Sequence, residues 1–384
     1  MKEIYSRLVL ALMFGASSAV AHESISLEEA FTQGELSTSI GWYAQSIDAK
    51  GGEKDSGFSN GFAEVGFETA AMYGVSLGIK GFRSVKTSEE NDGDYKNTME
   101  DNAVLSEAYL KIAHEGMGKI VVGSQAVEYN WLGDYIDGVT AQLDAIDQVV
   151  LSMAWARRYA VVGFDEISET FSKVNGNDGV YMMDLKYTPI EVLEINPYFY
   201  YSQDVFSAYG AKVSVNYALN DEWKSKTMAH YVDVQSDLSG TPNGSFAQGE
   251  QGFEFAGAVV AVGYMKVDKN GMVNSFVNGD IYGLGDFGDT SPFEEGNHVF
   301  APDAKTPYVR AEYEINGLKL AGIYGKTRYF DEDAIKKLSE KEWNVSVSYA
   351  WTKPFETTLL YVDVDNDDAT QSYQGVKVMA RYTF

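Results

Sequence analysis

Charged side chains occupy alternate positions in several segments of this sequence. In YVRAEYEI, residues 308–315, Arg310, Glu312 and Glu314 alternate with valine, alanine, tyrosine and isoleucine. Successive side chains of a β-strand point to opposite faces, so one face of this segment is polar and the other apolar. Charges at this spacing suit the wall of an aqueous channel, where rings of one sign decide which ions pass.

The same parity places ionisable side chains on the polar faces of many segments. These residues are Glu64, Glu68, Lys80, Glu107, Lys111, Lys186, Lys212, Arg310, Glu312, Glu314, Asp363, Lys377 and Arg381. Of these, we predict Glu107, Glu312 and Asp363 as acidic positions of a pore wall. The alternative interpretation is a hydrated wall in which each charge is solvated or belongs to an ion pair.

Catalysis is not indicated by the residue types available. The sequence has no cysteine, and its four histidines are at positions 22, 114, 230 and 298. None of them neighbours a recognisable nucleophile or a partner at metal-ligand spacing. We therefore expect no enzymatic activity, no metal site and no cofactor.

Long β-strands are needed to position the charged faces, and aromatic residues mark the strand ends. In WNVSVSYAW, residues 343–351, Trp343 and Trp351 end an apolar face that also carries two valines and a tyrosine. Aromatic rings prefer the two interfaces of a bilayer, so this pattern is typical of a strand that crosses a membrane. The last ten residues, GVKVMARYTF, alternate in the same way.

The connections between these segments alternate in length, as in an antiparallel meander with one short-turn rim and one long-loop rim. Short links such as TPIE and ALNDE are separated by long acidic or glycine-rich segments such as KTSEENDGDYKNTMED. We predict strands near 35–46, 61–70, 74–84, 103–114, 118–126, 143–154, 158–165, 179–188, 193–203, 209–218, 222–233, 251–257, 259–267, 306–316, 318–328, 341–351, 356–364 and 374–384. About 18 strands give the even count of a closed single-chain barrel, and about 16 are the alternative.

A transmembrane β-barrel explains the pattern better than a soluble sandwich. In lipid, every backbone N–H and C=O needs a partner within the protein, and only a closed sheet provides this with strands. An open sheet of this length would also expose edges that are prone to aggregation. A barrel of this size encloses a lumen too wide for its own side chains to fill, so we predict water behind the polar face.

The N-terminus has the features of a secretory signal peptide. Lys2 and Arg7 accompany a short apolar run, and AVA at 19–21 fits a small-residue cleavage site. We predict a signal peptide over 1–21 and one barrel domain over 22–384. A membrane anchor is the alternative, although the run is much shorter than the ~20 residues that a bilayer requires. The formal charge of −26 argues against a nucleic-acid-binding protein, because binding to phosphates requires a basic surface.

One long connection is rich in aromatic and acidic residues. We predict that this third long connection, VEYNWLGDYIDGVTAQ at 127–142, folds into the lumen. Its aromatic residues Tyr129, Trp131 and Tyr135 would pack against the wall, and its acidic residues Glu128, Asp134 and Asp137 would face the water. An external loop packed on the rim is the alternative.

Three other charged segments are interpreted as solvated loops. DEDAIKKLSEK at 331–341 is expected to form one or two helical turns. EENDGD at 89–94 and DVDNDD at 363–368 concentrate oxygen ligands of the kind that calcium prefers, but the second run lacks the sixth-position glycine and distal glutamate of an EF-hand loop. A calcium site, or weak binding of divalent ions beside lipopolysaccharide, is the alternative for these two runs.

The order of several segments resembles the Opr/OprD-like outer-membrane porins, including the major outer-membrane porins of epsilon-class proteobacteria. The segments are GELSTSIGWY at 34–43, DNAVLSEAYL at 101–110, KIVVGSQ at 119–125, the turn at 135–138 and the terminal RYTF at 381–384. The resemblance extends over most of the chain after residue 21 and rests on no single motif. It implies an 18-stranded barrel, often assembled as a homotrimer, with its third loop folded into the channel.

The resemblance also implies roles for individual residues. It implies a pore constriction at Glu128, Tyr129, Asp134, Tyr135 and Asp137. It implies basic pore-wall positions at Lys80, Lys111, Arg310, Lys377 and Arg381, since carboxylate-selective members place a basic ladder opposite acidic loop residues. The terminal Phe384 implies recognition by the barrel-assembly machinery of Gram-negative bacteria.

We therefore expect a porin of the Gram-negative outer membrane, in contact with membrane lipid and lipopolysaccharide, through which ions and small hydrophilic solutes diffuse passively. The acidic excess departs from an anion-selective pattern, so we expect a general or cation-preferring pore. A structural or adhesive barrel is the first alternative, and a barrel hydrolase with a Ser/His or Asp/His pair at one rim is the second.

Overall fold

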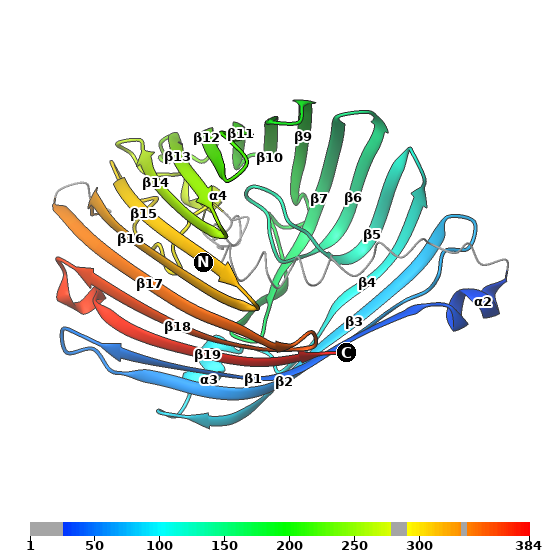
Figure 1. Cartoon of the computed structure of the whole chain (residues 1–384), viewed down its shortest axis with the longest axis horizontal. Helices are drawn as coiled ribbons and strands as arrows, with labels where there is room; N and C mark the ends of the chain where they lie inside the picture. The colour runs from blue at the N-terminus through cyan, green and yellow to red at the C-terminus, as the bar shows by residue number, and fades with distance from the viewer. Residues whose placement is uncertain (1–25, 278–289, 332–335) are drawn as a thin grey trace.

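The computed structural model describes residues 26–277, 290–331 and 336–384, most of which belong to one antiparallel sheet (Figure 1). The strands in these ranges are β1 Glu35–Ala49, β2 Ser56–Glu68, β3 Val75–Glu89, β4 Ala103–His114, β5 Gly118–Ala126, β6 Tyr135–Ile146, β7 Val149–Val162, β8 Ile167–Lys173, β9 Val180–Ile190, β10 Leu193–Ser202, β11 Phe206–Ala218, β12 Trp223–Ser236, β13 Gly244–Phe255, β14 Ala258–Val267, β15 Lys305–Ile315, β16 Leu318–Phe330, β17 Lys337–Thr352, β18 Phe355–Asn366 and β19 Tyr373–Thr383. The helices are α2 Leu27–Thr32, α3 Asp94–Thr98, α4 Asn274–Val277 and the 3-10 turn η2 Ala369–Gln371.

The sheet closes on itself. β1 pairs with β2 on one side and with β19 on the other, in a ladder that runs from Ser39↔Thr383 to Ala49↔Tyr373. β7 pairs with β9, whereas the short β8 pairs with the last part of β7 and, through Ile167, forms an isolated bridge with Met99, so β8 is not a strand of the ring. The ring therefore has 18 strands, which confirms the predicted barrel and its larger strand count. The alternative of 16 strands is wrong.

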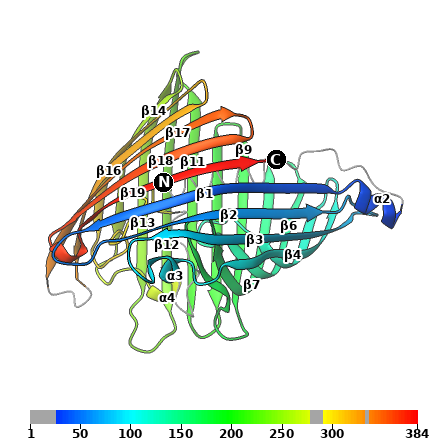
Figure 2. The ribbon, with the colours of Figure 1, turned by 90° about the horizontal axis from the view of Figure 1, so that it is seen from below.

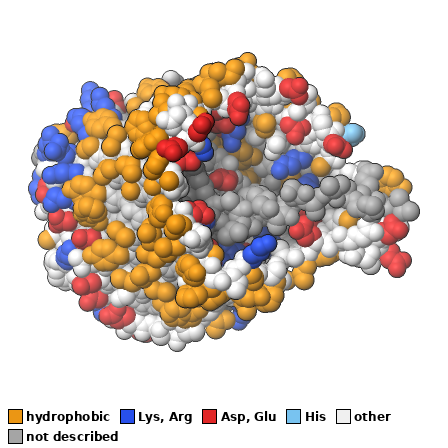
Figure 3. Space-filling view, in the orientation of Figure 1, with side chains coloured by type: hydrophobic (Ala, Val, Ile, Leu, Met, Phe, Trp, Pro, Cys, Tyr) orange, Lys and Arg blue, Asp and Glu red, His pale blue; other side chains and the backbone are white. Residues whose placement is uncertain are grey.

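The two faces of the strands differ as the alternation predicts. On β17, Trp343, Val345 and Trp351 are exposed on the outer side, whereas Glu342 and Asn344 are buried on the inner side. Hydrophobic side chains gather over the strands at the left of the molecule in Figure 3. Lipid solvates such an apolar outer face, so its exposure is favourable in a membrane.

The two rims of the barrel carry connections of different length, and Figure 2 shows the strands running between them. At one rim most connections have two to four residues, as at 147–148, 191–192 and 316–317. We number the connections of the other rim in chain order, so that L2 is 90–102, L3 is 127–134, L4 is 163–179 and L7 is 268–304. Of L7, only 268–277 and 290–304 belong to the described residues.

The predicted boundaries are wrong around L3. The sequence prediction treats 127–142 as a loop and AWARR, 154–158, as a turn between strands 143–154 and 158–165. In the structure, β6 already begins at Tyr135, β7 runs through AWARR, and the turn between them is at 147–148. The left-handed backbone of Gln148, with φ 67°, makes that tight reversal.

The charged segment at 331–341 is also different from the prediction. β17 begins at Lys337 and continues through Glu340, so this part is strand and not helix. Leu338 and Glu340 are buried because they face the interior of the barrel. The number of charged residues in the segment does not predict this burial. Residues 332–335 lie outside the described residues.

The short helix α2 precedes β1 at the short-turn rim (Figures 1 and 2). The backbone N–H of Ala70 donates a hydrogen bond of 2.9 Å to the carbonyl of Ala30, and the ring of Phe31 stacks on Phe67. The predicted signal peptide, residues 1–21, lies outside the described residues. In the described ranges, no helix is both long and apolar enough to cross a bilayer.

Candidate pore and its lining

L3 crosses from β5 to β6 as a compact turn whose tip contacts the nearby wall at β9 and β10. Backbone hydrogen bonds of 2.8 Å from Val127 to Asp134 and from Tyr129 to Leu132 hold the turn together. At the tip, the Asn130 amide donates to Asp184 of β9 at 3.1 Å and to Asn196 of β10 at 2.8 Å. The tip of L3 is therefore tied to the inner face of β9 and β10.

Trp131 continues this attachment and is only 2% exposed. Its indole Nε1 donates a hydrogen bond of 2.8 Å to the Tyr198 hydroxyl, and its backbone N–H donates to the Tyr200 hydroxyl at 3.1 Å. Its ring lies 5.0–5.9 Å, between centroids, from four other rings: His230, Phe246, Phe276 and Phe300. Two of these rings belong to the wall and two to L7.

The described parts of L7 also enter the lumen, a position that the sequence prediction did not assign to this long connection. Phe276, Phe293 and Val299 are each 3% exposed or less. The Thr290 hydroxyl donates to the backbone carbonyl of Asn130 at 2.7 Å, which joins L7 to the tip of L3. The large apolar residues among the glycines and acidic residues of L7 could have predicted that this loop is buried, because such side chains avoid water.

Carboxylates of β17 hold the second half of L7. The buried Glu342 carboxylate accepts hydrogen bonds from the backbone N–H groups of Glu295, at 3.0 Å, and Gly296, at 2.9 Å. Glu340 lies 2.8 Å from the His298 ring nitrogen. Glu340 was missed because the sequence prediction assigned 331–341 to a surface loop. Glu342 lies within the predicted strand 341–351, and its role was missed because its partners in L7 are distant in sequence.

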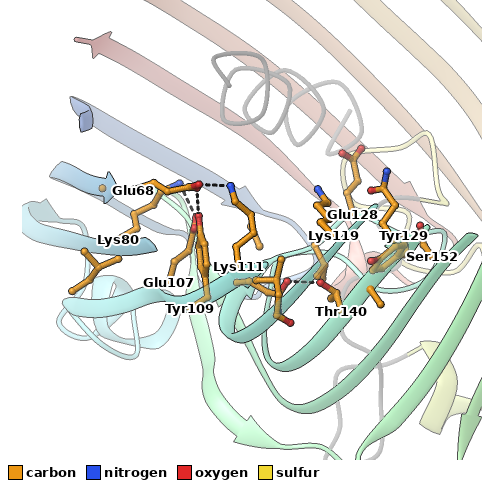
Figure 4. A pocket seen from close by; sticks show the side chains of 18 of the residues that line it. Glu68, Lys80, Glu107, Tyr109, Lys111, Lys119, Glu128, Tyr129, Thr140 and Ser152 are labelled. Carbon is orange, nitrogen blue, oxygen red and sulfur yellow. Dashed lines mark hydrogen bonds and ion pairs between the residues drawn. The ribbon is translucent and has the colours of Figure 1, made fainter. Parts of the chain in front are cut away.

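Two of the five predicted constriction residues, Glu128 and Tyr129, line a cavity of about 580 Å³ beneath L3. Burial, reinforced by the nearby Asp184 carboxylate, raises the pKa of Tyr129 to about 12, so its hydroxyl stays protonated at neutral pH. The wall of this cavity comes from β1 to β7 and β9, and Figure 4 shows its labelled charged side chains.

The other three predicted constriction residues do not line this cavity. Asp134 accepts a hydrogen bond of 3.2 Å from the Tyr159 hydroxyl. Tyr135 is on β6 and is 3% exposed. Asp137, also on β6, lies 2.8 Å from Arg157 and 2.6 Å from Arg158, so both arginines compensate its charge.

Each of the five predicted basic wall residues lies beside a carboxylate. The pairs are Lys80 with Glu107 at 2.8 Å, Lys111 with Glu68, Arg310 with Glu250 at 2.6 Å and with Glu312, Lys377 with Glu294 at 2.9 Å and Glu295 at 3.1 Å, and Arg381 with Glu64 at 4.0 Å. The predicted acidic residue Asp363 lies 3.2 Å from Lys50. Alternation fixes which face a charge occupies, but register and loop contacts decide its partner.

Two lysines of the cavity differ from these pairs. Lys119 on β5 and Lys186 on β9 line the cavity, and neither forms an ion pair within the described part of the chain. Lys186 was among the predicted polar-face residues, whereas Lys119 was missed. Its inward parity, shared with Val121 and Gln125, could have identified it. These lysines and Glu128 bring uncompensated charge of both signs to one cavity.

Among the residues that the structure describes, no group of three or more His, Cys, Asp or Glu side chains is arranged to hold a metal ion. The EENDGD run lies at the end of β3 and the start of L2, where Asp94 accepts backbone hydrogen bonds from Gly57 at 2.9 Å and Asn91 at 3.0 Å. Burial would raise the pKa of Asp94, but these donors lower it below its ordinary value. The run therefore ties L2 to the start of β2.

Comparisons with known proteins agree with this architecture. A family model described as "Putative outer membrane protein" matches residues 18–236. The Acinetobacter baumannii protein OccAB1 has a similar solved structure, with a TM-score of 0.78 and 12% identity, covering 94% of this chain and 99% of that one. A BenF-like porin from Pseudomonas fluorescens Pf-5 also gives a TM-score of 0.78 at 12% identity, covering 92% and 99%.

A third solved structure, the outer membrane protein opdK from Pseudomonas aeruginosa, gives a TM-score of 0.70 at 13% identity, covering 91% of this chain and 99% of that one. These identities are low, so the similarity concerns the fold. A search of curated protein sequences finds no match. The predicted resemblance to the OprD-like porin barrels is confirmed at the level of the fold.

Proposed function

Because the chain belongs to the HP_OMP_2 family of outer-membrane proteins, we propose that its barrel is a passive channel of the outer membrane for ions and small hydrophilic solutes. The observation that carries this proposal is the closed 18-stranded ring with a polar inner face and a cavity beneath L3. A ring of this size holds water, because its own side chains cannot fill the lumen.

The contacts of L3 and L7 support a narrow passage rather than a wide one. Both loops occupy part of the lumen, and Glu128 and Tyr129 line the cavity that remains beside them. In this proposal, Glu128 and Tyr129 form the constriction. Lys119, Lys186 and Glu128 act on permeating ions, because charges in a narrow pore are only partly screened by water.

The proposed selectivity is weak. The basic side chains that would make a strongly anion-selective wall each have a carboxylate beside them, so the wall offers little net positive charge. Small solutes of either sign would pass, with a preference for cations from the acidic excess of the chain. No catalytic step and no cofactor are part of this proposal.

The outer face contacts membrane lipid, as expected for an outer-membrane barrel. We further propose contact of the long-loop rim with lipopolysaccharide, assembly by the barrel-assembly machinery through the segment that ends at Phe384, and association into a homotrimer. The proposed signal peptide, 1–21, would be removed during export. N-terminal sequencing of the protein extracted from outer membranes tests that removal, and a retained Met1 would refute it.

A liposome swelling assay tests the channel proposal. Liposomes that contain the purified protein are diluted into isosmotic solutions of small sugars and amino acids of increasing size. The proposal predicts swelling rates that fall as the solute grows, since the passage beside L3 is narrow. Liposomes that swell no faster than protein-free ones would contradict it.

A further inference from the structure

The lumen contains a packed cluster of aromatic side chains, and none of its members is among the predicted pore-wall residues. We define the L3–L7 cluster as Trp131, Tyr198, Tyr200, His230, Phe246, Phe276 and Phe300. It combines the tip of L3, two residues of L7 and the inner faces of β10, β12 and β13. Trp131, Tyr200, Phe246 and Phe276 are each 2% exposed or less, so water reaches almost none of this cluster.

The polar atoms inside the cluster have partners within the protein. The Tyr198 hydroxyl accepts from the Trp131 indole at 2.8 Å and lies 2.5 Å from Nε2 of His230. The Tyr200 hydroxyl accepts from the Trp131 backbone at 3.1 Å. Buried phenol and indole groups usually need a hydrogen-bond partner, and these groups find one without water. The cluster can therefore remain dry inside a barrel that elsewhere holds water.

Trp131 is the residue on which both loops converge. It contacts the L7 rings Phe276 and Phe300, and the adjacent Asn130 is tied to β9, β10 and Thr290 of L7. Glu128 and Tyr129, three and two residues before Trp131 respectively, line the cavity on the other side of L3. Fixing Trp131 thus fixes the position of the proposed constriction.

From these contacts we infer that L3 and the described parts of L7 form one dry plug against β10 to β13. We infer that Trp131 is the positioning residue of this plug and that the conducting path is confined to the cavity side. This inference rests on the proposed channel function. It assigns to Trp131 an indirect role, since the indole itself does not face the path. Water and solutes would pass beside Glu128 and Tyr129 and not along the inner face of β11.

The absence of cysteine from the sequence allows a direct test with single engineered thiols. Ser152 on β7 lines the cavity, and Ala208 on β11 is 0% exposed within the same buried cluster as Trp131. Both are small residues of the barrel wall, so Ser152→Cys and Ala208→Cys are matched substitutions. The probe is a charged, water-soluble methanethiosulfonate applied to the folded protein in lipid.

With Trp131 in place, Ser152→Cys should react, and Ala208→Cys should react at least ~10-fold more slowly, because a buried thiol reacts only when its surroundings open. Adding Trp131→Ala should bring the rate at Ala208→Cys close to that at Ser152→Cys. Equal rates in the presence of Trp131 would overturn the dry plug. A rate at Ala208→Cys that Trp131→Ala leaves unchanged would overturn the role of Trp131.

Trp131→Phe provides a second variant if the alanine variant does not fold, because it keeps an aromatic ring while it removes the indole N–H donor and part of the ring volume. Trp131→Phe should raise the reaction rate of the thiol at Ala208→Cys less than Trp131→Ala does. If Trp131→Phe changes the folding yield but leaves this reaction rate unchanged, the positioning role of Trp131 is contradicted. The comparison of the two thiols with Trp131 present does not require either variant. A protein that carries no current refutes the channel, while the two thiol rates still decide whether the plug is dry.

Discussion

The buried Glu342 carboxylate of β17 lies 2.9 Å from the backbone nitrogen of Gly296 in L7. Glu342 also accepts from the backbone of Glu295 and from the Asn344 amide, and Lys377 reaches Glu294 and Glu295 from β19. Backbone N–H groups that enter the lumen need acceptors there, because water cannot reach all of them. The wall thus supplies the partners that allow L7 to stay inside the barrel.

Replacing Glu342 with alanine should release this part of L7 without unfolding the barrel. Hydrogen bonds to a charged group each contribute about 1.5–3 kcal/mol, so losing them favours the detached loop, whereas the strand ladders remain. The expected result is new protease cleavage near Gly296 and a noisier open-channel current. Ser346→Ala, on the same face of β17, is the control. Protection equal to that of the native protein would show that Glu342 does not hold L7.

Neutralising Glu128 should shift the ion selectivity toward anions. Glu128 lines the cavity with no ion pair among the described residues, so Glu128→Gln removes an uncompensated negative charge. Measurement of the reversal potential in a salt gradient checks this. Asp137→Asn is the matched control, since Asp137 does not line the cavity, and it should change the potential less. A larger effect at Asp137 would place the constriction on β6 instead.

Removing the unpaired lysines Lys119 and Lys186 should shift the ion selectivity in the opposite direction, toward cations. Lys119→Gln together with Lys186→Gln should raise the cation-to-anion permeability ratio by about twofold or more, because charges a few ångströms from the path act through a partly protein-like dielectric. Lys80→Gln combined with Glu107→Gln is the control. Lys80 and Glu107 lie 2.8 Å apart and both line the cavity, so removing the pair leaves the net charge of the cavity unchanged and should alter the ratio little. No change in the double variant would remove both lysines from the path.

The orientation of the wall predicts which substitutions a membrane tolerates. Val345 on β17 faces outward and is 46% exposed, whereas the neighbouring Ser346 faces the lumen. Val345→Arg should destabilise the barrel by about 2–4 kcal/mol near the bilayer midplane. Ser346→Arg should cost less, since Ser346, although only 5% exposed, shares the inner face of β17 with Asn344 and Ser348, so the arginine does not enter lipid. Denaturant titration of both variants folded into lipid vesicles measures the difference, and equal free energies of unfolding would contradict the assignment of faces.

The barrel could be predicted from sequence because a bilayer imposes a period of two on each strand. The alternation in WNVSVSYAW and GVKVMARYTF assigned the outer faces of β17 and β19 correctly, since lipid selects apolar residues at those positions. The prediction was wrong at AWARR, because two adjacent arginines were interpreted as part of a turn. In the structure, both arginines form ion pairs with Asp137 of the neighbouring strand β6. Local composition could not reveal that contact.

The site was less predictable than the barrel because its contacts are non-local. The position of L7 depends on Glu342, about fifty residues further along the chain, and the L3 tip depends on Asp184 and Asn196. The five basic wall residues were assigned from their parity and from a family resemblance, and neither identifies their carboxylate partners. Only the three-dimensional register shows that Lys119 and Lys186 remain without such partners in the described residues.

Single-channel recording of the purified native protein in a planar lipid bilayer tests the central claim most directly. A water-filled channel predicts discrete, stable current steps whose size rises with salt concentration in the absence of any energy source. A barrel that inserts into the bilayer, confirmed by its heat-modifiable mobility on gels, and yet carries no current would contradict the account.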